Sequence, residues 1–171
     1  IGEATVLKFY PGRLQVDITE RSAFALWQMD GHVSVIAEDG AILDSEVTRR
    51  VTTLPLVVGK GADTRAKEFL LVLDRHPAVR GSVKAAVLIG ERRWNLRLAN
   101  GIDVKLPEDE VEAALTRLAG LERDDHLFSR DITVIDLRLP DRVTVRLSEA
   151  AAEARAARLK EKKNARKAGD A

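Results

Sequence analysis

The feature that most constrains this chain is a stretch near its end, residues 131–147, in which apolar and polar side chains alternate around a Pro-Asp dipeptide. Alternation with a period of two predicts two half-buried β-strands joined by a turn. From residue 135 on, the apolar residues of both strands have odd numbers. They share one face only if odd-numbered residues pair with odd-numbered residues, as for Leu139 opposite Val143. This register leaves a three-residue loop, because a two-residue turn would require a positive φ at Pro140.

The same register continues along both strands of this closing hairpin. It sets Ile135 opposite Leu147 and, on the other face, Asp136 opposite Arg146 as a cross-strand ion pair. The strand pattern stops after Leu147, so we expect this strand to be the last one. A last strand with no sequential successor can lie at a sheet edge, where a strand of another chain can pair with it.

Composition is typical of a globular protein and argues against nucleic-acid binding. Hydrophobic residues make up 45% and charged residues 32% of the chain. Residues 149–171 carry seven Lys/Arg against four Asp/Glu, which leaves the first 148 residues at a net charge of −2. Such a body offers no basic face for phosphates. The absence of cysteine excludes disulfides, cysteine-ligated zinc and a thiol nucleophile.

The start of the sequence is that expected of a piece of a longer protein. The chain begins at Ile1 without a Met and enters a strand-like pattern at residues 5–10. No apolar run approaches the roughly 18 residues needed to cross a bilayer, and no signal peptide is present. We expect the upstream part to be missing, so the lack of an anchor in this piece carries no information about the intact protein.

Turn residues divide the chain into short strands. Two registers fit the pair around Asp30-Gly31, and both stay open. A second hairpin crosses the loop Ala99-Asn100-Gly101, whose glycine then takes the left-handed position that glycine favours. Its strands set Leu96 opposite Val104. The predicted strands are residues 5–10, 13–19, 24–28, 32–37, 41–43, 54–58, 83–89, 93–98, 102–106 and the two of the closing hairpin.

Two helices complete the predicted fold. Residues 62–75 place four apolar side chains at helical spacing and end before Pro77. Residues 107–121 have Pro107 at the first position, three acidic residues in the first turn and an apolar stripe. The prediction is therefore an α+β protein, with two helices packed on a hairpin-rich antiparallel sheet.

No group of residues predicts a catalytic, cofactor or metal site. Residues 57–64 run strand, Gly-x-Gly, helix, but they lack a third glycine and a following Lys-Ser/Thr, so a plain loop is favoured over a phosphate site. The three histidines share no metal-ligand spacing, and no serine lies in a Gly-x-Ser-x-Gly motif. Asp44 and Glu46 could pair as acid and base, yet acids beside a turn are usually solvated. We expect no enzymatic activity and no small-molecule substrate.

The end of the chain is basic and nearly free of large apolar residues. Leu159 is the one such residue between 149 and 167, which predicts a solvated helix or a disordered tail. Its cations could alternatively bind an anionic polymer. They are Arg155, Arg158, Lys160, Lys162, Lys163, Arg166 and Lys167.

Six short motifs occur along the chain in an order that resembles a known family. They are Thr19-Glu-Arg-Ser-Ala-Phe-Ala-Leu-Trp27, Asp39-Gly40, Leu54-Pro55 with Val58-Gly59, Arg92-Arg-Trp-Asn-Leu96, Asn100-Gly-Ile-Asp-Val-Lys-Leu-Pro107 and Ile135-Asp-Leu-Arg-Leu-Pro-Asp-Arg142. Over roughly residues 5–148, the chain resembles the periplasmic part of the FtsQ/DivIB family of bacterial cell-division proteins.

The resemblance implies a domain plan and a location. Family members have a cytoplasmic tail, one transmembrane helix, a POTRA domain and a β domain. Residues 1–21 would be the end of a POTRA domain, residues 22–148 the FtsQ-type β domain, and residues 149–171 the basic tail. The intact protein would be a single-pass protein of the inner membrane, with this region in the periplasm at the division septum.

The resemblance also implies a non-enzymatic divisome scaffold. It would bind the small bitopic proteins FtsB and FtsL by strand addition and recruit later septation proteins. Arg138 matches an arginine expected to pair with an acidic residue of FtsB. Leu139 and Leu147 replace aromatic residues that are frequent in the family, so backbone pairing carries more of the expectation than these side chains do. The two leucines could equally well fill the core. The implied contact residues are Arg138, Leu139, Arg142, Val143, Thr144, Val145, Arg146 and Leu147.

Overall fold

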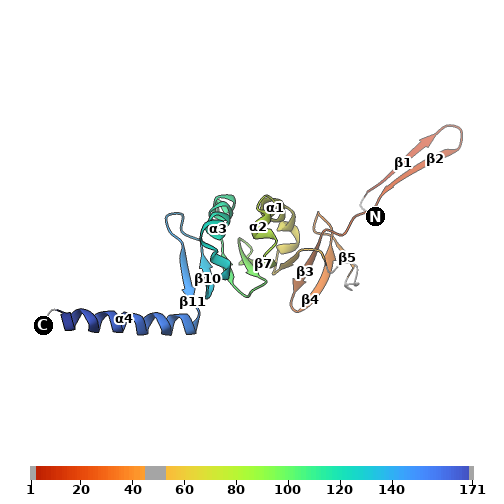
Figure 1. Ribbon diagram of the computed structural model, residues 1–171. Helices are drawn as coiled ribbons and strands as arrows, with labels where there is room; N and C mark the ends of the chain where they lie inside the picture. The colour runs from red at the N-terminus through yellow and green to blue at the C-terminus, as the bar shows by residue number, and fades with distance from the viewer. Residues whose placement is uncertain (1–2, 45–52, 170–171) are drawn as a thin grey trace. The chain divides into compact units, whose positions relative to one another are not determined.

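The computed structural model describes residues 3–44 and 53–169. The chain divides into two compact units, Ile1–Phe69 and Leu70–Ala171. The boundary falls inside helix α1 (Ala62–Asp74), the first of the two predicted helices (Figure 1).

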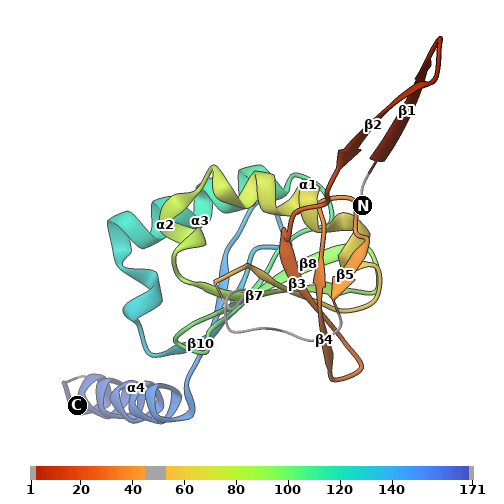
Figure 2. The ribbon, with the colours of Figure 1, turned by 90° about the vertical axis from the view of Figure 1, so that its right-hand side faces the viewer.

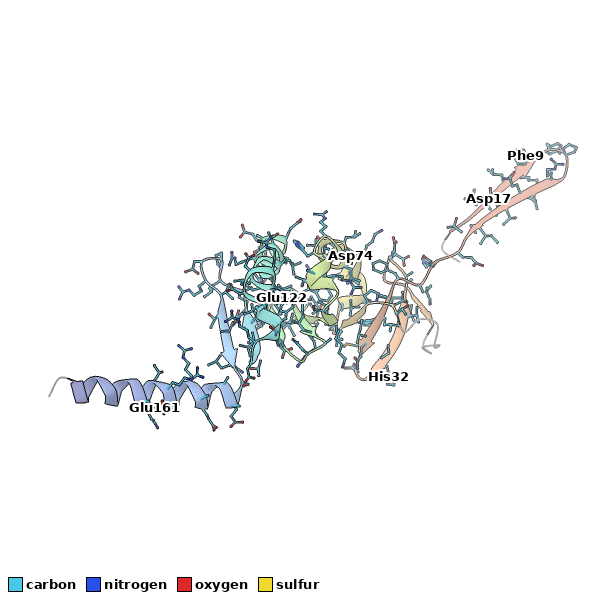
Figure 3. All side chains as sticks on the ribbon, in the orientation of Figure 1. Phe9, Asp17, His32, Asp74, Glu122 and Glu161 are labelled. Carbon is cyan, nitrogen blue, oxygen red and sulfur yellow. The ribbon has the colours of Figure 1, made fainter. Side chains whose placement is uncertain are left out.

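The first unit begins with a hairpin whose described side chains are all solvent-exposed. Strand β1 (Glu3–Phe9) pairs antiparallel with β2 (Arg13–Thr19), with Val6 opposite Val16. Every side chain from residue 4 to residue 19 is exposed, and Figure 3 shows those of Phe9 and Asp17 projecting from the hairpin. Because three of the four residues Val6, Leu14, Val16 and Ile18 are β-branched, this segment favours strand although it buries nothing here.

Four further strands of the first unit lie side by side. The turn between β3 and β4 decides between the two registers that fit the sequence, because Met29 pairs with His32. Asp30 and Gly31 both have positive φ, 49° and 82°, as a type I′ turn requires. In spatial order β6-β3-β4-β5, the strands are β3 (Ala25–Met29), β4 (His32–Ile36), β5 (Ile42–Asp44) and β6 (Leu56–Val58).

The second unit contains five strands in the spatial order β11-β10-β9-β8-β7. Three of them form buried rows across the sheet, such as Leu96, Val104 and Ile135, all of which are fully buried. The strands are β7 (Val83–Ile89), β8 (Arg93–Leu98), β9 (Asp103–Lys105), β10 (Ile132–Asp136) and β11 (Thr144–Leu147).

Helices of the second unit cover one face of these strands. Figure 2 shows α2 and α3 on one side of β7 and β10. Helix α3 buries Ala114, Leu115 and Leu118, as its apolar stripe predicts. The helical segments after α1 are α2 (Pro77–Arg80), α3 (Val111–Asp125), a 3-10 turn (Leu127–Ser129) and α4 (Glu149–Gly169).

The predicted α+β class with a hairpin-rich sheet is confirmed, with two differences of detail. The pairs β3–β6 and β9–β10 are parallel. Helix α3 begins at Val111 instead of Pro107. The chain is still bound to β8 at Leu106, whose N–H donates to Trp94, and Glu110 has a left-handed φ of 57°. The acidic segment after Leu106 is therefore a turn that precedes the helix.

The basic end of the chain forms helix α4, one of the two predicted states. Ser148 begins it by accepting a hydrogen bond from the N–H of Ala151 at 3.1 Å. Leu159 is exposed, as expected for a solvated helix. Within the described residues, no helix combines the length and the apolarity needed to span a bilayer.

Candidate partner-binding edge

The closing hairpin has the two predicted strands but a different register. Ile135 lies opposite Val145 and Asp136 lies opposite Thr144. The predicted three-residue loop and the predicted Asp136–Arg146 pair are therefore wrong. The observed register is shifted from the predicted one by two residues. Because side chains alternate with a period of two, each still lies on its predicted face.

Strand β10 ends early because two interactions direct the chain away from β11. The N–H of Leu137 donates to the carbonyl oxygen of Lys105 on β9 at 2.9 Å. The carboxylate of Asp136 accepts the N–H of Arg138 at 3.2 Å and binds its guanidinium, with 2.6 Å between Oδ2 and Nη2. Residues 137–143 therefore connect the strands as a longer loop.

The Asp136–Arg138 pair is the main electrostatic feature of this loop. The hydrogen bond from Arg138 lowers the pKa of the Asp136 carboxyl, and the same contact raises the pKa of the Arg138 guanidinium. The Asp136 side chain is 22% exposed and that of Arg138 is 43% exposed. Arg138 is thus held in one orientation at the surface of the loop.

Strand β11 ends the order of strands in this unit and has a single neighbour, β10, among the described residues. Successive residues of a strand direct their backbone N–H and C=O groups to opposite neighbouring strands. Since the Leu137 N–H bonds to β9, the backbone groups of Val134 and Asp136 are directed toward β11. The backbone groups of the paired residues Arg146 and Thr144 are in turn directed toward β10. The backbone N–H and C=O groups of the alternate residues, Val145 and Leu147, therefore point away from β10.

The buried row across the sheet also ends at β11. Leu96, Val104 and Ile135 are fully buried, and the next residue of the row, Val145, is 41% exposed. Leu147 is half-buried. An added strand with an apolar side chain beside Val145 would continue this row and remove the exposed surface from water.

A cavity of about 250 Å³ lies beside the loop. It has both acidic and basic walls, and it is closed on one side by the start of α3. Its lining includes Glu110, Ala113 and Arg117 from the helix and its N-terminal turn, with Leu137, Arg138 and Pro140 from the loop. Sequence reasoning missed the helical side of this cavity, since no local pattern predicts how α3 packs beside a distant loop.

The structure brings the eight expected contact residues together on one loop and one strand. Leu139 is 51% exposed, so it does not fill the core. The backbone oxygen of Leu139 accepts a hydrogen bond from Arg117 at 3.4 Å. Arg142 pairs with the adjacent Asp141 at 3.0 Å. Whether these residues bind a partner stays a prediction.

The other candidate sites have structural explanations or no support. The Gly-x-Gly segment is a loop in which the Gly59 carbonyl accepts a hydrogen bond from the Trp27 indole at 2.9 Å. No group of three potential metal ligands occurs among the described residues. Glu46, the second member of the candidate acid–base pair, lies outside the described residues, as do the side chains of Lys162, Lys163, Arg166 and Lys167. The described part of α4 mixes acidic and basic residues, which gives no specific support to polymer binding.

Comparison with known proteins identifies the family. Residues 25–138 match the model of "Cell division protein FtsQ/DivIB, C-terminal". The chain belongs to the FtsQ/DivIB family of cell-division proteins. The matched region includes Arg138 and ends before β11.

Curated FtsQ proteins are similar over most of this chain. Cell division protein FtsQ of Bradyrhizobium diazoefficiens is 58% identical over 171 residues, which is 100% of this chain and 50% of the relative. That of Rhizobium meliloti is 43% identical over 151 residues, which is 88% of this chain and 49% of the relative. The chain thus spans about half the length of the curated relatives it matches.

A solved structure is also similar to part of the chain. It is the major extracytoplasmic domain of the cell-division protein DivIB from Geobacillus stearothermophilus. The likeness covers 62% of this chain and 98% of that one, at 18% sequence identity. Its TM-score of 0.40 is too low to support a conclusion, so family membership rests on the sequence matches.

Proposed function

We propose that this chain is the periplasmic region of a divisome scaffold, and that β11 receives a strand of FtsB in a complex with FtsL. The observation that carries the proposal is the edge itself. The backbone groups of Val145 and Leu147 point away from β10, on the side where no described strand lies, and Val145 leaves a buried row unfinished at the surface. Strand addition uses such an edge for affinity and alternate side-chain positions for specificity.

Family membership supports the rest of the proposal. The scaffold would be non-enzymatic, anchored in the inner membrane by a single span outside this chain, and located at the division septum. There it would recruit later septation proteins.

Arg138 can take part although it already binds Asp136. Its bonds to the carboxylate use Nε and Nη2. A guanidinium carries five N–H donors, so the remaining N–H groups can bind a carboxylate of the partner. Asp136 would then orient Arg138 for that contact.

The cavity beside Arg138 offers a place for one side chain of the partner. Its volume of about 250 Å³ is large enough for an aromatic or long aliphatic group. Its position beside the loop means that a strand on β11 could place a flanking residue in it.

The test is a Val145→Pro variant, with Val145→Thr as the matched control. Proline removes the outward N–H of Val145, which has no partner on β10, so the hairpin keeps its own bonds. We expect Val145→Pro to lose capture of the FtsB–FtsL periplasmic complex in titration calorimetry, and Val145→Thr to retain it. Circular dichroism and urea unfolding would establish that both variants are folded.

Normal capture by a folded Val145→Pro protein would rule out pairing at this edge. Equal loss in both variants would assign the effect to the valine side chain instead of the backbone.

A further inference from the structure

A second row of side chains crosses the sheet on the face opposite the helices. The paired residues on adjacent strands are Arg97 on β8, Asp103 on β9, Val134 on β10 and Arg146 on β11. Arg97 and Asp103 form an ion pair at 2.8 Å. The first cation of the row therefore has its anion on the neighbouring strand.

Arg146 has no such anion. Its side chain is exposed, and no carboxylate of the described residues lies within ion-pairing distance of it. Its inner neighbour in the row is the apolar Val134, and Asp136 is bound to Arg138. Arg146 is thus an exposed cation on the outermost strand of this unit, with no described anion beside it on β10.

We infer that the strand which pairs with β11 carries an Asp or Glu beside Arg146. This inference rests on the proposed function, because it requires a strand at that edge. Side chains opposite one another on neighbouring strands share a face, in either strand orientation. A residue across from Arg146 therefore projects to the open face with it, at a Cβ separation of about 4.5–5.5 Å.

The two faces together define the partner sequence. Residues across from Val145 and Leu147 lie on the helix side, where the buried row ends, and are expected to be apolar. The residue between them lies across from Arg146 and is expected to be acidic. The recognised element is thus an apolar–acidic–apolar triplet in an extended segment, which selects against partners with Lys or Arg at its centre.

A charge-reversal experiment tests this inference. The probe is the periplasmic segment of FtsB, with each Asp and Glu replaced in turn by Lys. We expect Arg146→Glu to weaken capture of the unaltered segment about 3- to 10-fold at low salt, and less at high salt. One of the Lys-substituted segments should recover binding to Arg146→Glu and lose binding to the unaltered chain.

Lys84→Glu is the matched control, since it changes the net charge equally on an exposed residue of β7, which three strands separate from β11. It should leave capture within about twofold, as a charge far from the contact adds little. Capture that is unaffected by Arg146→Glu, or that no single reversal restores, would overturn the inference while leaving strand addition intact. Unchanged capture by Val145→Pro would instead overturn the proposed function.

Discussion

The second unit contains two hairpins, β8–β9 and β10–β11, that look alike in sequence and differ in how tightly their neighbours hold them. In both, apolar residues alternate along two strands and a short polar segment separates them. Strands β8 and β9 each pair on both sides, whereas β11 pairs on one. The difference separates a part of the sheet that is held on both sides from a part with one described neighbour, which is the part proposed to bind a partner.

The loops follow the same division. In β8–β9, Asn100 accepts the N–H of Ile102 at 3.2 Å and donates to the Phe128 carbonyl at 2.7 Å. In β10–β11, Arg138 binds the carboxylate of Asp136 at the end of β10, and Arg142 binds that of Asp141 in the same loop. A side chain thus ties the first loop to another segment of the unit. In the second loop the charged side chains bind neighbours in sequence, and other segments hold it through the backbone groups of Leu137 and Leu139.

The largest effect on stability is expected from Gly101→Val in the tight loop. Gly101 has a φ of 88°, and a Cβ at this position would meet no atom within 4 Å, so the cost comes from the backbone conformation. We expect a loss of about 1–3 kcal/mol in the free energy of unfolding, measured in urea. Arg142 in the other loop does not have a positive φ, so Arg142→Val should change the free energy of unfolding by no more than about 0.5 kcal/mol. Similar losses in both variants would remove the distinction between the loops.

A smaller effect is expected from Asp136→Asn, and it should depend on pH. The lowered pKa of Asp136 means that its ionised form stabilises the folded chain above its ordinary pKa near 4, and that this contribution is lost as the pH falls through the lowered value. Since both side chains of the pair are partly exposed, we expect a loss of at most about 1 kcal/mol at pH 7.

Urea unfolding of the wild type and Asp136→Asn at pH 7 and at pH 3 would measure this difference. It should shrink at the lower pH, while Asp141→Asn, in an exposed pair, should change stability little at either pH. A difference that grew on acidification would contradict the assignment to the ionised carboxylate.

The smallest effect is expected from inserting Gly-Ser between Asp141 and Arg142. Lengthening a flexible loop by two residues costs less than about 0.6 kcal/mol. The same insertion between Asn100 and Gly101 would break the bond from the Gly101 N–H to Leu98 at 3.0 Å and cost about 1 kcal/mol or more. Chemical denaturation of the two insertion variants would compare them directly, and the reverse order would refute the argument.

These hairpins also show what the sequence can and cannot predict. For β8–β9, the prediction of Leu96 opposite Val104 and of a glycine-ended three-residue loop is confirmed. In this tight turn, one register both matched the apolar faces and placed the glycine at the left-handed position. Strands β7 and β8 likewise have their predicted bounds.

For β10–β11 the same reasoning gave a register two residues away. Alternation determines which face a residue occupies, but it does not distinguish registers that differ by two. The deciding interactions were the bond from Leu137 to Lys105 and the Asp136–Arg138 pair. The first depends on the parallel neighbour β9, which local patterning does not reveal. The start of α3 was misplaced for a related reason, since the bond of Leu106 to Trp94 overrides the helix-start preference of Pro107.

The two strands of the candidate site were predictable from the sequence, and their register was not. The alternation predicted the strands, and the family motifs supplied the expectation that contact residues lie on them. The outward direction of Val145 and the helical wall of the cavity depend on pairing and packing between distant segments.

The shortness of β11 limits how strongly backbone pairing alone can hold a partner. Ser148 already bonds back to Asp131 and begins α4, so the outward edge consists of the N–H and C=O groups of Val145 and Leu147. Hydrogen bonds of this kind contribute about 0.5–1.5 kcal/mol each, so four of them provide about 2–6 kcal/mol. Micromolar affinity requires about 8 kcal/mol. In the proposed complex, a strand with poorly matched side chains would therefore dissociate readily, and helix α4, which stops β11 after Leu147, would act as a filter on partner sequence.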